Sequence, residues 1–309
     1  PMSHIPVLLR EALNGLCIKQ DRVYLDCTFG CGGHSRAILA SVGEFGRLIG
    51  LDRDPSAVSV GMKLAHEDPR FRMIHTAFSK LEEALDNLGI ERVEGILMDL
   101  GVSSPQLEEA HRGFSFQADG PLDMRMDPTT GESAAEWVAR ADTKEIAHVL
   151  WVFGEERFSR RIARAIVEAR STKPIQTTAQ LGKIISDAQP IKDHNKHPAT
   201  RTFQAIRLYI NGELTEVEQG LNAAINRLDI GGRLAVISFH SLEDRLVKRA
   251  LRDASRPPRG DPRMPLPDNL AKSKLRLIGK AIKAGPDELQ MNPRARSAVL
   301  RVAERTEAA

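Results

Sequence analysis

The chain of 309 residues is long enough for two domains of ordinary size, or for one large domain that carries an insertion. Its composition, 41% hydrophobic and 28% charged, is typical of a globular protein that folds in water. The sequence has no apolar run near the roughly 18 residues that a membrane span needs, and its three cysteines do not make a disulfide framework. Composition thus excludes membrane-spanning and disulfide-stabilised secreted proteins, and we expect a cytoplasmic protein with no membrane partner.

Positive charge is distributed unevenly along the chain, although the formal net charge is only +3. Residues 245–309 hold 16 Lys and Arg against 7 Asp and Glu, and residues 157–207 hold 11 against 3. Segregated positive charge is typical of proteins that bind polyanions. A solvated surface balanced by acidic neighbours explains the same counts, so charge alone leaves nucleic-acid binding open.

The first hundred residues alternate short apolar runs with helical patterns. Strands are predicted over residues 23–26, 48–52, 71–75 and 93–100, and helices over residues 34–41, 55–66 and 79–88. Strands that alternate with helices of this length predict a parallel sheet with right-handed crossovers.

The alternation stops between residue 107 and about residue 204, where only helical patterns are found. One helix is predicted to begin with residues 132–140. Another has an apolar stripe between Phe158 and Ala169. The opposite face of this second helix carries Arg157, Arg160, Arg161 and Arg164.

The strand and helix pattern returns after residue 206. A helix over residues 213–228 is expected to end at Gly231 and Gly232, and a strand over 234–239, a helix over 242–251 and a hairpin of 275–278 with 298–302 follow. We therefore predict one α/β domain made of residues 1–106 and 207–309. It is interrupted by an inserted helical domain, residues 107–206, with a role in substrate recognition.

A glycine-rich turn, CTFGCGGHS (residues 27–35), joins the first predicted strand to the first predicted helix. Glycines let a ligand approach the backbone, and the start of the helix offers unpaired N–H groups. Asp52 ends the second strand 22 residues after Gly30, at the spacing of acids that bind ribose hydroxyls. The combination predicts a nucleotide-type cofactor site.

Two cofactors suit such a site, a dinucleotide and S-adenosylmethionine. Ser35 or Arg36 stands where a dinucleotide fingerprint has its third glycine. The carboxylate of Asp26, just before the turn, would repel a pyrophosphate but pair with the ammonium of a methionine moiety. S-adenosylmethionine is therefore favoured, and the alternatives are a nicotinamide-dependent oxidoreductase and an RNA-binding factor without catalysis.

The fourth predicted strand ends in DLGVSSPQ (residues 99–106), at the sheet edge where open α/β folds bind ligands. An acid with a following proline resembles the signature of amino-methyltransferases. The lone pair of an exocyclic base amine is delocalised into the ring, and acceptors on its N–H bonds localise it. Asp99 is a candidate for such an acceptor or for a cofactor ligand, and the sequence does not decide between these roles. Ser103, Pro105 and, at the end of a later strand, His240 are further catalytic candidates.

In that signature an aromatic residue follows the proline and stacks on the base, but here none does. Phe114 and Phe116 are candidates for this stacking, with core packing as the alternative. The cysteines lie away from this segment, which argues against methylation at a ring carbon. Cys27, Cys31 and His34 have no second ligand pair, so we expect no metal site.

Eight segments together resemble one family, the bacterial small-subunit 16S ribosomal RNA (cytosine-N4)-methyltransferases, also called MraW or RsmH. They are GCGGHS (30–35), LDRDP (51–55), DLGVSSPQ (99–106), RGFSF (112–116), GPLDMRMD (120–127), HPATRTFQ (197–204), SFHSLEDR (238–245) and NPRARS (292–297). The resemblance runs from His4 almost to the C-terminus. Cys31 departs from it, because relatives often carry another residue there.

The resemblance implies a class I S-adenosylmethionine-dependent methyltransferase, with a Rossmann-like sheet and an inserted helical domain. The implied reaction methylates the exocyclic N4 amine of a cytosine in the decoding region of 16S rRNA, on the small ribosomal subunit, and releases S-adenosylhomocysteine. Matching the family motifs places the cofactor contacts at Gly32, Gly33, His34, Asp52, Phe78, Asp99 and Gln106.

Arginines are the candidate RNA contacts, because guanidinium groups bind phosphates and do not act as bases at neutral pH. This group comprises Arg160, Arg161, Arg164, Arg294 and Arg296. The polar motifs near Asp123 and Asp244 suit either a functional or a loop-fixing role, the second including a helix cap formed by Ser241 and Asp244. The oligomeric state is not determined by the sequence, and a homodimer is one open alternative.

Overall fold

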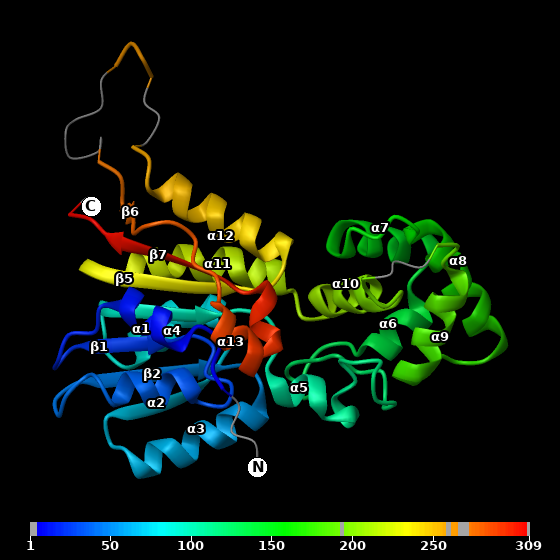
Figure 1. Ribbon diagram of the computed structural model, residues 1–309, viewed down its shortest axis with the longest axis horizontal. Coiled ribbons are helices and arrows are strands. Elements are labelled where there is room, and N and C mark those ends of the chain that lie inside the picture. The colour runs from blue at the N-terminus through cyan, green and yellow to red at the C-terminus, as the bar shows by residue number, and fades with distance from the viewer. Residues whose placement is uncertain (1–4, 192–194, 258–260, 265–271, 308–309) are drawn as a thin grey trace. The chain divides into compact units, whose positions relative to one another are not determined.

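The computed structural model describes residues 5–191, 195–257, 261–264 and 272–307. It divides the chain into two compact units, residues 1–101 with 214–309, and residues 102–213 (Figure 1). The helical insertion expected at residues 107–206 falls within the second unit. No helix among the described residues is long and apolar enough to cross a membrane.

The described part of the first unit contains one seven-stranded sheet in the order β3-β2-β1-β4-β5-β7-β6. The strands are β1 (Val23–Asp26), β2 (Arg47–Asp52), β3 (Phe71–His75), β4 (Val93–Asp99), β5 (Leu228–Ser238), β6 (Leu275–Leu277) and β7 (Val299–Arg305). Strands β1 to β5 are parallel, and β7 runs antiparallel to both β5 and β6. This confirms the predicted α/β sheet with a closing hairpin, the arrangement of the class I methyltransferase fold.

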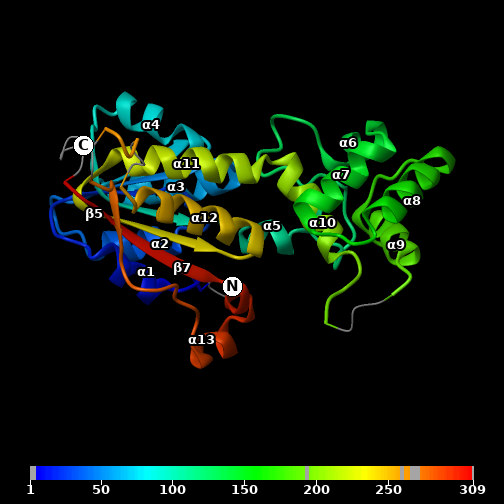
Figure 2. The ribbon, with the colours of Figure 1, turned by 90° about the horizontal axis from the view of Figure 1, so that it is seen from above.

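Helices cover both faces of this sheet. They are α1 (Leu9–Leu16), α2 (Gly33–Leu39), α3 (Pro55–Glu67), η1 (Phe78–Lys80), α4 (Leu81–Asn87), α11 (Glu213–Arg227), α12 (Ser241–Ala254), α13 (Pro286–Met291) and η3 (Pro293–Ser297). Apolar side chains of α1, α2 and α3 share one buried cluster with the sheet, and those of α4, α11 and α12 share another. Figure 2 shows α12 running beside β5 and β7.

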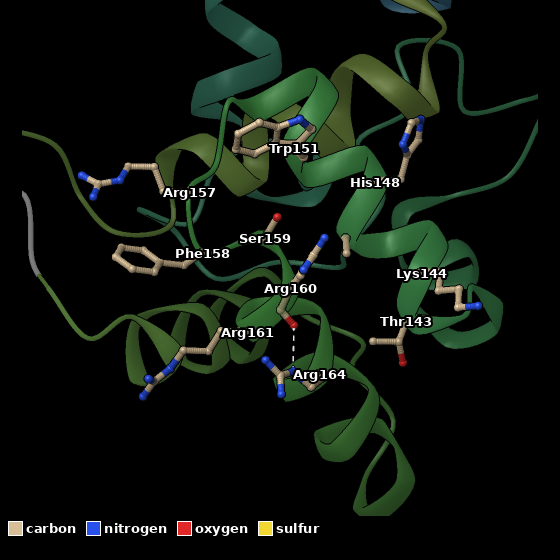
Figure 3. A pocket seen from close by; sticks show the side chains of 11 residues that line it. Thr143, Lys144, His148, Trp151, Arg157, Phe158, Ser159, Arg160, Arg161 and Arg164 are labelled. Carbon is tan, nitrogen blue, oxygen red and sulfur yellow. Dashed lines mark hydrogen bonds between the residues drawn. The ribbon is translucent and has the colours of Figure 1, made fainter.

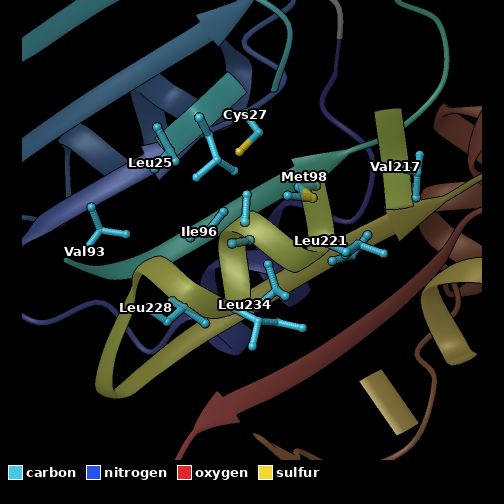
Figure 4. Close-up of a cluster of buried hydrophobic side chains, with 14 of the residues drawn as sticks. Leu25, Cys27, Val93, Ile96, Met98, Val217, Leu221, Leu228 and Leu234 are labelled. Carbon is cyan, nitrogen blue, oxygen red and sulfur yellow. The ribbon is translucent and has the colours of Figure 1, made fainter. Parts of the chain in front are cut away.

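The second of these clusters explains why the central strands are almost wholly apolar. Strand β4 is buried from Val93 to Met98, as expected for a parallel strand that is covered on both faces. Leu221 of α11 packs over Ile96 and Leu234 of the neighbouring strands (Figure 4). This packing fixes the carboxyl ends of β1, β4 and β5 relative to one another.

Strand β5 begins six residues earlier than the sequence predicts. The helix before it ends at Arg227, and Gly231 and Gly232 lie within the strand. The pairing of β4 with β5 shifts register between Val93 and Gly95, and Gly231 has a φ of 80°. A Cβ on Gly232 would lie 2.8 Å from the Glu94 carbonyl oxygen. The glycine pair therefore forms a β-bulge and does not end the helix.

The described part of the second unit is helical, apart from an isolated bridge between Pro121 and Thr177. Its elements are α5 (Ser104–Glu108), η2 (Ala110–Arg112), α6 (Ala134–Arg140), α7 (Thr143–Gly154), α8 (Ser159–Thr172), α9 (Thr178–Ala188) and α10 (Thr200–Ile210). Their core surrounds Trp137, which is fully buried and donates its indole N–H to Glu145. Helices α1, α7, α9, α10 and α13 were not among the predicted elements.

The polar motif at residues 120–127 has a structural role in this unit. Asn211 accepts the Met126 N–H at 2.8 Å and donates to the Met124 carbonyl oxygen at 2.8 Å. Met124, which is completely buried, has a φ of 62°, in the left-handed region that non-glycine residues rarely adopt. Arg125 is held by Asp123 at 2.7 Å. The motif is thus a loop clamp, the loop-fixing alternative that the sequence left open.

Replacing the clamping amide is expected to destabilise the second unit. Asn211→Ala would leave the buried Met124 and Met126 backbone groups without these bonds, at a cost of about 1–3 kcal/mol in free energy of unfolding. Urea denaturation followed by tryptophan fluorescence measures it, because both tryptophans, Trp137 and Trp151, lie in this unit. Asn222→Ala, at an exposed position of α11, is the control. Equal urea midpoints for both variants would contradict the clamp.

Candidate functional site

The glycine-rich turn follows β1 and is tied to the end of β2. Gly30, with a φ of 57°, donates its N–H to Asp52 Oδ2 at 2.8 Å. Gly32 has a φ of 84°, and a Cβ there would lie 2.7 Å from the Phe29 ring. A Cβ on Gly33 would lie 2.2 Å from Pro6 Cγ. The glycines that were predicted to admit a cofactor thus also allow close packing of the chain on itself.

Asp26 is part of this turn and does not face an open site. It is 1% exposed, and its carboxylate accepts the Ser35 hydroxyl at 2.6 Å and the Thr28 N–H at 3.1 Å. Burial raises the pKa of Asp26, and the Ser35 hydrogen bond opposes this shift. Asp26 thus holds the turn together in this structure, and its pairing with the ammonium of a methionine moiety stays a prediction.

Asp52 ends β2 with its carboxylate directed at two backbone N–H groups. Oδ2 accepts from Gly30, and Oδ1 accepts from Asp54 at 2.9 Å. Burial raises its pKa to about 6, although both of these hydrogen bonds favour the charged form. A carboxylate has about four lone-pair sites, so this half-buried group can still accept hydrogen bonds from a ligand.

Asp99 ends β4, between the ends of β1 and β5 in the sheet order. Its N–H donates to the Thr28 hydroxyl at 2.7 Å, which ties the strand end to the turn. Its carboxylate Oδ2 lies 3.6 Å from Nδ1 of His34, whereas Oδ1 is buried and has no hydrogen-bond partner among the described residues. Burial raises the pKa of Asp99 to about 6, against the opposing effect of His34 and, more weakly, Arg294.

His34 is 6% exposed, and its ring joins Asp99 to the N-terminal segment. Nε2 lies 3.0 Å from the Val7 carbonyl oxygen, so this nitrogen must carry a hydrogen and donate it. The segment is held from outside as well, since Glu288 accepts the Leu8 N–H at 2.7 Å and the Asn292 amide donates to the Ile5 carbonyl oxygen at 3.1 Å. His34 is therefore fixed on the N-terminal backbone with its other ring nitrogen beside Asp99, at a distance too long for a hydrogen bond.

The residues after Asp99 form a helix start in the second unit. Ser103 caps α5, with its hydroxyl accepting the Gln106 N–H at 3.4 Å and its own N–H donating to Gln106 Oε1 at 3.0 Å. Pro105 occupies the first turn, where no N–H is required. The spacing Ser-x-x-Gln is a capping box that the sequence already contained. Ser103 and Gln106 thus have a structural task besides their predicted roles.

His240 caps α12 after the end of β5. Its Nδ1 accepts the Glu243 N–H at 3.4 Å, so the ring hydrogen is on Nε2, which lies 3.2 Å from Glu243 Oε1. The cap predicted for Ser241 and Asp244 is therefore wrong. Asp244 instead binds Arg301 at 2.8 and 3.0 Å, and that arginine lowers the pKa of Asp244.

The remaining cofactor and RNA candidates of the first unit lie on separate elements. Phe78 packs on α11, where a Cβ on Gly220 would lie 2.3 Å from the phenylalanine ring. Arg294 is half-buried on η3 and acts electrostatically on Asp99, and its contact with an RNA phosphate stays a prediction. Arg296 on the same element is exposed.

Both phenylalanines that were candidates for base stacking take part in packing within the second unit. Phe114 is 5% exposed, with the Arg112 guanidinium 5.7 Å from its ring centre. Phe116 is half-buried, stacks on His197 with ring centres 4.3 Å apart, and meets Phe203 edge to face at 5.0 Å. Core packing, the alternative reading of this pair, is what the structure has, most clearly for Phe114.

The basic face predicted on the helix after residue 157 is present on α8. Arg160, Arg161 and Arg164 are exposed and line a cavity of about 960 Å³. The described residues hold no group of three or more His, Cys, Asp or Glu arranged to bind a metal ion.

Comparison with known proteins finds relatives that match almost the whole chain. A family model described as the MraW methylase family matches residues 1–306. Ribosomal RNA small subunit methyltransferase H of Pseudoalteromonas atlantica is 58% identical over 307 residues, covering 98% of each chain. The protein of the same name from Thiobacillus denitrificans is 56% identical over 304 residues, 98% of this chain and 97% of that one. A solved rRNA methylase structure from Streptococcus thermophilus is 10% identical with a TM-score of 0.44, covering 99% and 100% of the two chains.

The raised pKa of Asp99 predicts a stability cost at neutral pH. A carboxyl group with a pKa near 6 when folded and near 3.8 when unfolded destabilises the fold as pH rises from 4 to 6, and fully above 6. Asp99→Asn is therefore expected to raise the free energy of unfolding by about 2–3 kcal/mol at pH 7.5 and by only about 1 kcal/mol at pH 4.5.

Denaturation of the ligand-free protein at both pH values measures this effect. Asp68→Asn is a control of opposite sign, because Arg70 lowers the pKa of Asp68 and its loss should destabilise the protein at pH 7.5. An Asp99→Asn effect that does not change with pH would refute the burial argument.

Proposed function

The chain belongs to the MraW methylase family of S-adenosylmethionine-dependent methyltransferases, and on this premise we propose its substrate. We infer that it methylates the N4 amine of a cytosine in the decoding region of 16S rRNA, on the small ribosomal subunit. The names of its relatives, both small subunit rRNA methyltransferases, support this inference. The observation that carries the chemistry is Asp99, a strand-end carboxylate with one buried oxygen that has no hydrogen-bond partner among the described residues.

The residues at the carboxyl ends of β1, β2 and β4 fit S-adenosylmethionine. Asp52 keeps unused acceptor sites for ribose hydroxyls, and the unpartnered Oδ1 of Asp99 suits a cationic or N–H-bearing group. Phe78, half-buried in η1 just after β3, is our candidate for the adenine contact. We assign the cofactor to Asp52, Phe78 and the Gly30–Gly33 backbone, and we assign the unpartnered oxygen of Asp99 to the substrate amine.

Bound S-adenosylmethionine supplies an electrophilic methyl group on a sulfonium. The chain's part is to make the cytosine amine nucleophilic. We propose that Asp99 accepts one N4–H bond and so localises the nitrogen lone pair. When the N4–methyl bond forms, the nitrogen gives up one proton, which Asp99 takes and passes to solvent. A carboxyl group with a pKa near 6 is ionised at neutral pH and is basic enough to hold that proton briefly.

His34 is a positioning residue in this scheme. Its ring nitrogens lie against the Val7 carbonyl oxygen and the Asp99 carboxylate, which limits how the carboxylate can turn. His240, with its hydrogen on Nε2, is a candidate donor to a ring acceptor of the cytosine. Ser103 and Pro105 shape the start of α5, which carries the chain away from Asp99.

The substrate assignment is tested by methyl transfer from labelled S-adenosylmethionine to purified small subunits that lack the modification. We expect N4-methylcytidine by nucleoside mass spectrometry, and much less transfer to naked 16S rRNA or to DNA. Transfer of label to another position, or to DNA in preference, would refute the proposed substrate. Absence of transfer despite measurable cofactor binding would favour an RNA-binding factor without catalysis.

The two candidate roles of Asp99 are separated by kinetics. If it is the amine acceptor, Asp99→Asn lowers kcat by about 100-fold or more and leaves S-adenosylhomocysteine affinity within about threefold. The kcat of the unsubstituted enzyme should fall below about pH 6, as the carboxylate becomes protonated. Asp86→Asn, on exposed α4, is the control and should change neither value. Weakened cofactor affinity with an unchanged kcat would make Asp99 a cofactor ligand and end the acceptor proposal.

A further inference from the structure

Helices α7 and α8 of the second unit border a cavity of about 960 Å³, which is at the upper end of the range for small-molecule sites. Helix α7 contributes Thr143, Lys144, Ala147, His148 and Trp151, and the α8 side contributes Arg157, Phe158, Ser159, Arg160, Arg161 and Arg164. Figure 3 shows Trp151 and His148 on the α7 side and the arginines on the α8 side. The lining contains no carboxylate.

The five cationic side chains of this lining have no carboxylate within ion-pair distance in the described part of the chain. Among the described residues, no carboxylate forms an ion pair with Lys144, Arg157, Arg160, Arg161 or Arg164, and all five are exposed. The fixed arginines of the same unit are paired, as Arg140 is with Glu132 and Arg207 with Glu213. Unneutralised positive charge gathered around one cavity favours an anionic ligand.

Trp151 adds a second, independent feature. Its side chain is 60% exposed although it lies on a well-packed helix, whereas Trp137 is fully buried. The apolar stripe of α7 that faces the core consists of Ile146, Val149 and Leu150, and Trp151 falls outside it. An exposed indole beside guanidinium groups offers a flat surface for stacking a base, with donors for the adjoining phosphates.

We propose that this cavity binds an unpaired nucleotide of the RNA substrate, with its base stacked on Trp151 and its flanking phosphates held by Arg160, Arg161 and Arg164. The nucleotide is an anchor and not the methylated cytosine, because the lining has no carboxylate to accept an amine N–H bond. The inference rests on the proposed RNA substrate and extends it to a second contact. An acidic protein segment would use the cations but has no need of the indole, so RNA is the favoured ligand.

Fluorescence provides the direct test, because Trp151 is the exposed one of the chain's two tryptophans. The full-length protein is titrated with a single-stranded oligoribonucleotide of mixed sequence, its abasic counterpart, an RNA duplex and inorganic phosphate. We expect quenching by the single strand that exceeds quenching by the other three, and loss of that quenching in Trp151→Phe. Equal quenching by the abasic strand or by phosphate alone would overturn the base-stacking proposal.

Binding and kinetics test the same site without the fluorophore. Trp151→Ala should weaken single-strand binding by about 5- to 150-fold, and Trp151→Phe should restore part of it. Replacing Arg160, Arg161 and Arg164 by Ala should reduce the salt dependence of binding, by about 0.7 in the log–log slope per lost phosphate contact. Two exposed control sites are Phe45→Ala and Lys183→Ala, which should leave both quantities unchanged.

On small subunits, the cavity variants should raise KM with kcat and S-adenosylhomocysteine affinity nearly unchanged. An unchanged KM in an enzyme that still methylates subunits would overturn the anchor and leave the proposed function standing. If the unsubstituted enzyme methylates no RNA, the proposed function fails, and the oligonucleotide titration still decides whether the cavity binds single strands. Tighter binding of an acidic peptide than of RNA would assign the cavity to a protein partner.

Discussion

Three carboxyl groups, Asp26, Asp52 and Asp99, lie at the carboxyl edge of the sheet, and the cost of removing them from water is the constraint on which the site depends. Burial raises the pKa of each, and the charge of Asp26 raises the pKa of both others further. The turn answers this with N–H and O–H donors from Gly30, Thr28 and Ser35. Both oxygens of Asp26 and both oxygens of Asp52 therefore accept a hydrogen bond. Oδ1 of Asp99 has no hydrogen-bond partner among the described residues. The fold thus stores an electrostatic cost that a cation can relieve, which is the charge that S-adenosylmethionine carries.

The two units differ in how some of their cations are partnered. In the first unit, the half-buried arginines Arg233 and Arg301 beside the sheet are paired with Glu304 and Asp244. In the second unit, the cations of the cavity have no such partners among the described residues. A site for a cationic cofactor and a site for a polyanion would oppose each other if their side chains were mixed.

The fold could be predicted from the sequence far better than the roles of the site residues. Strands β1 and β3 have the predicted bounds, because turn residues border their apolar runs at both ends. The β-bulge at Gly231 escaped prediction, since a glycine pair also suits the end of a helix. Ser103, Gln106 and His240 lie in motifs with many polar residues. From the sequence alone, a helix cap cannot be told from a catalytic or binding role at such positions.

Residues that depend on three-dimensional packing could not be assigned from the sequence. Phe114 was a candidate for base stacking, but it is buried in the structure. Asp26 was a candidate for binding the cofactor, and the structure shows that its carboxylate also accepts the Ser35 hydroxyl. Trp151 was missed although a signal existed, because it falls outside the apolar spacing of Ile146, Val149 and Leu150. An aromatic residue outside the buried stripe of a helix has no packing reason to be there.

The charge of the cofactor also bears on the end of the reaction. Methyl transfer turns the sulfonium into a neutral thioether, so the product carries one positive charge fewer than S-adenosylmethionine. In the proposed site, the attraction between the cofactor and the strand-end carboxylates would then weaken. The carboxylates then lose part of the favourable interaction that offset their desolvation, which favours release of S-adenosylhomocysteine. The desolvated carboxylates at the sheet edge therefore favour binding of S-adenosylmethionine over binding of S-adenosylhomocysteine.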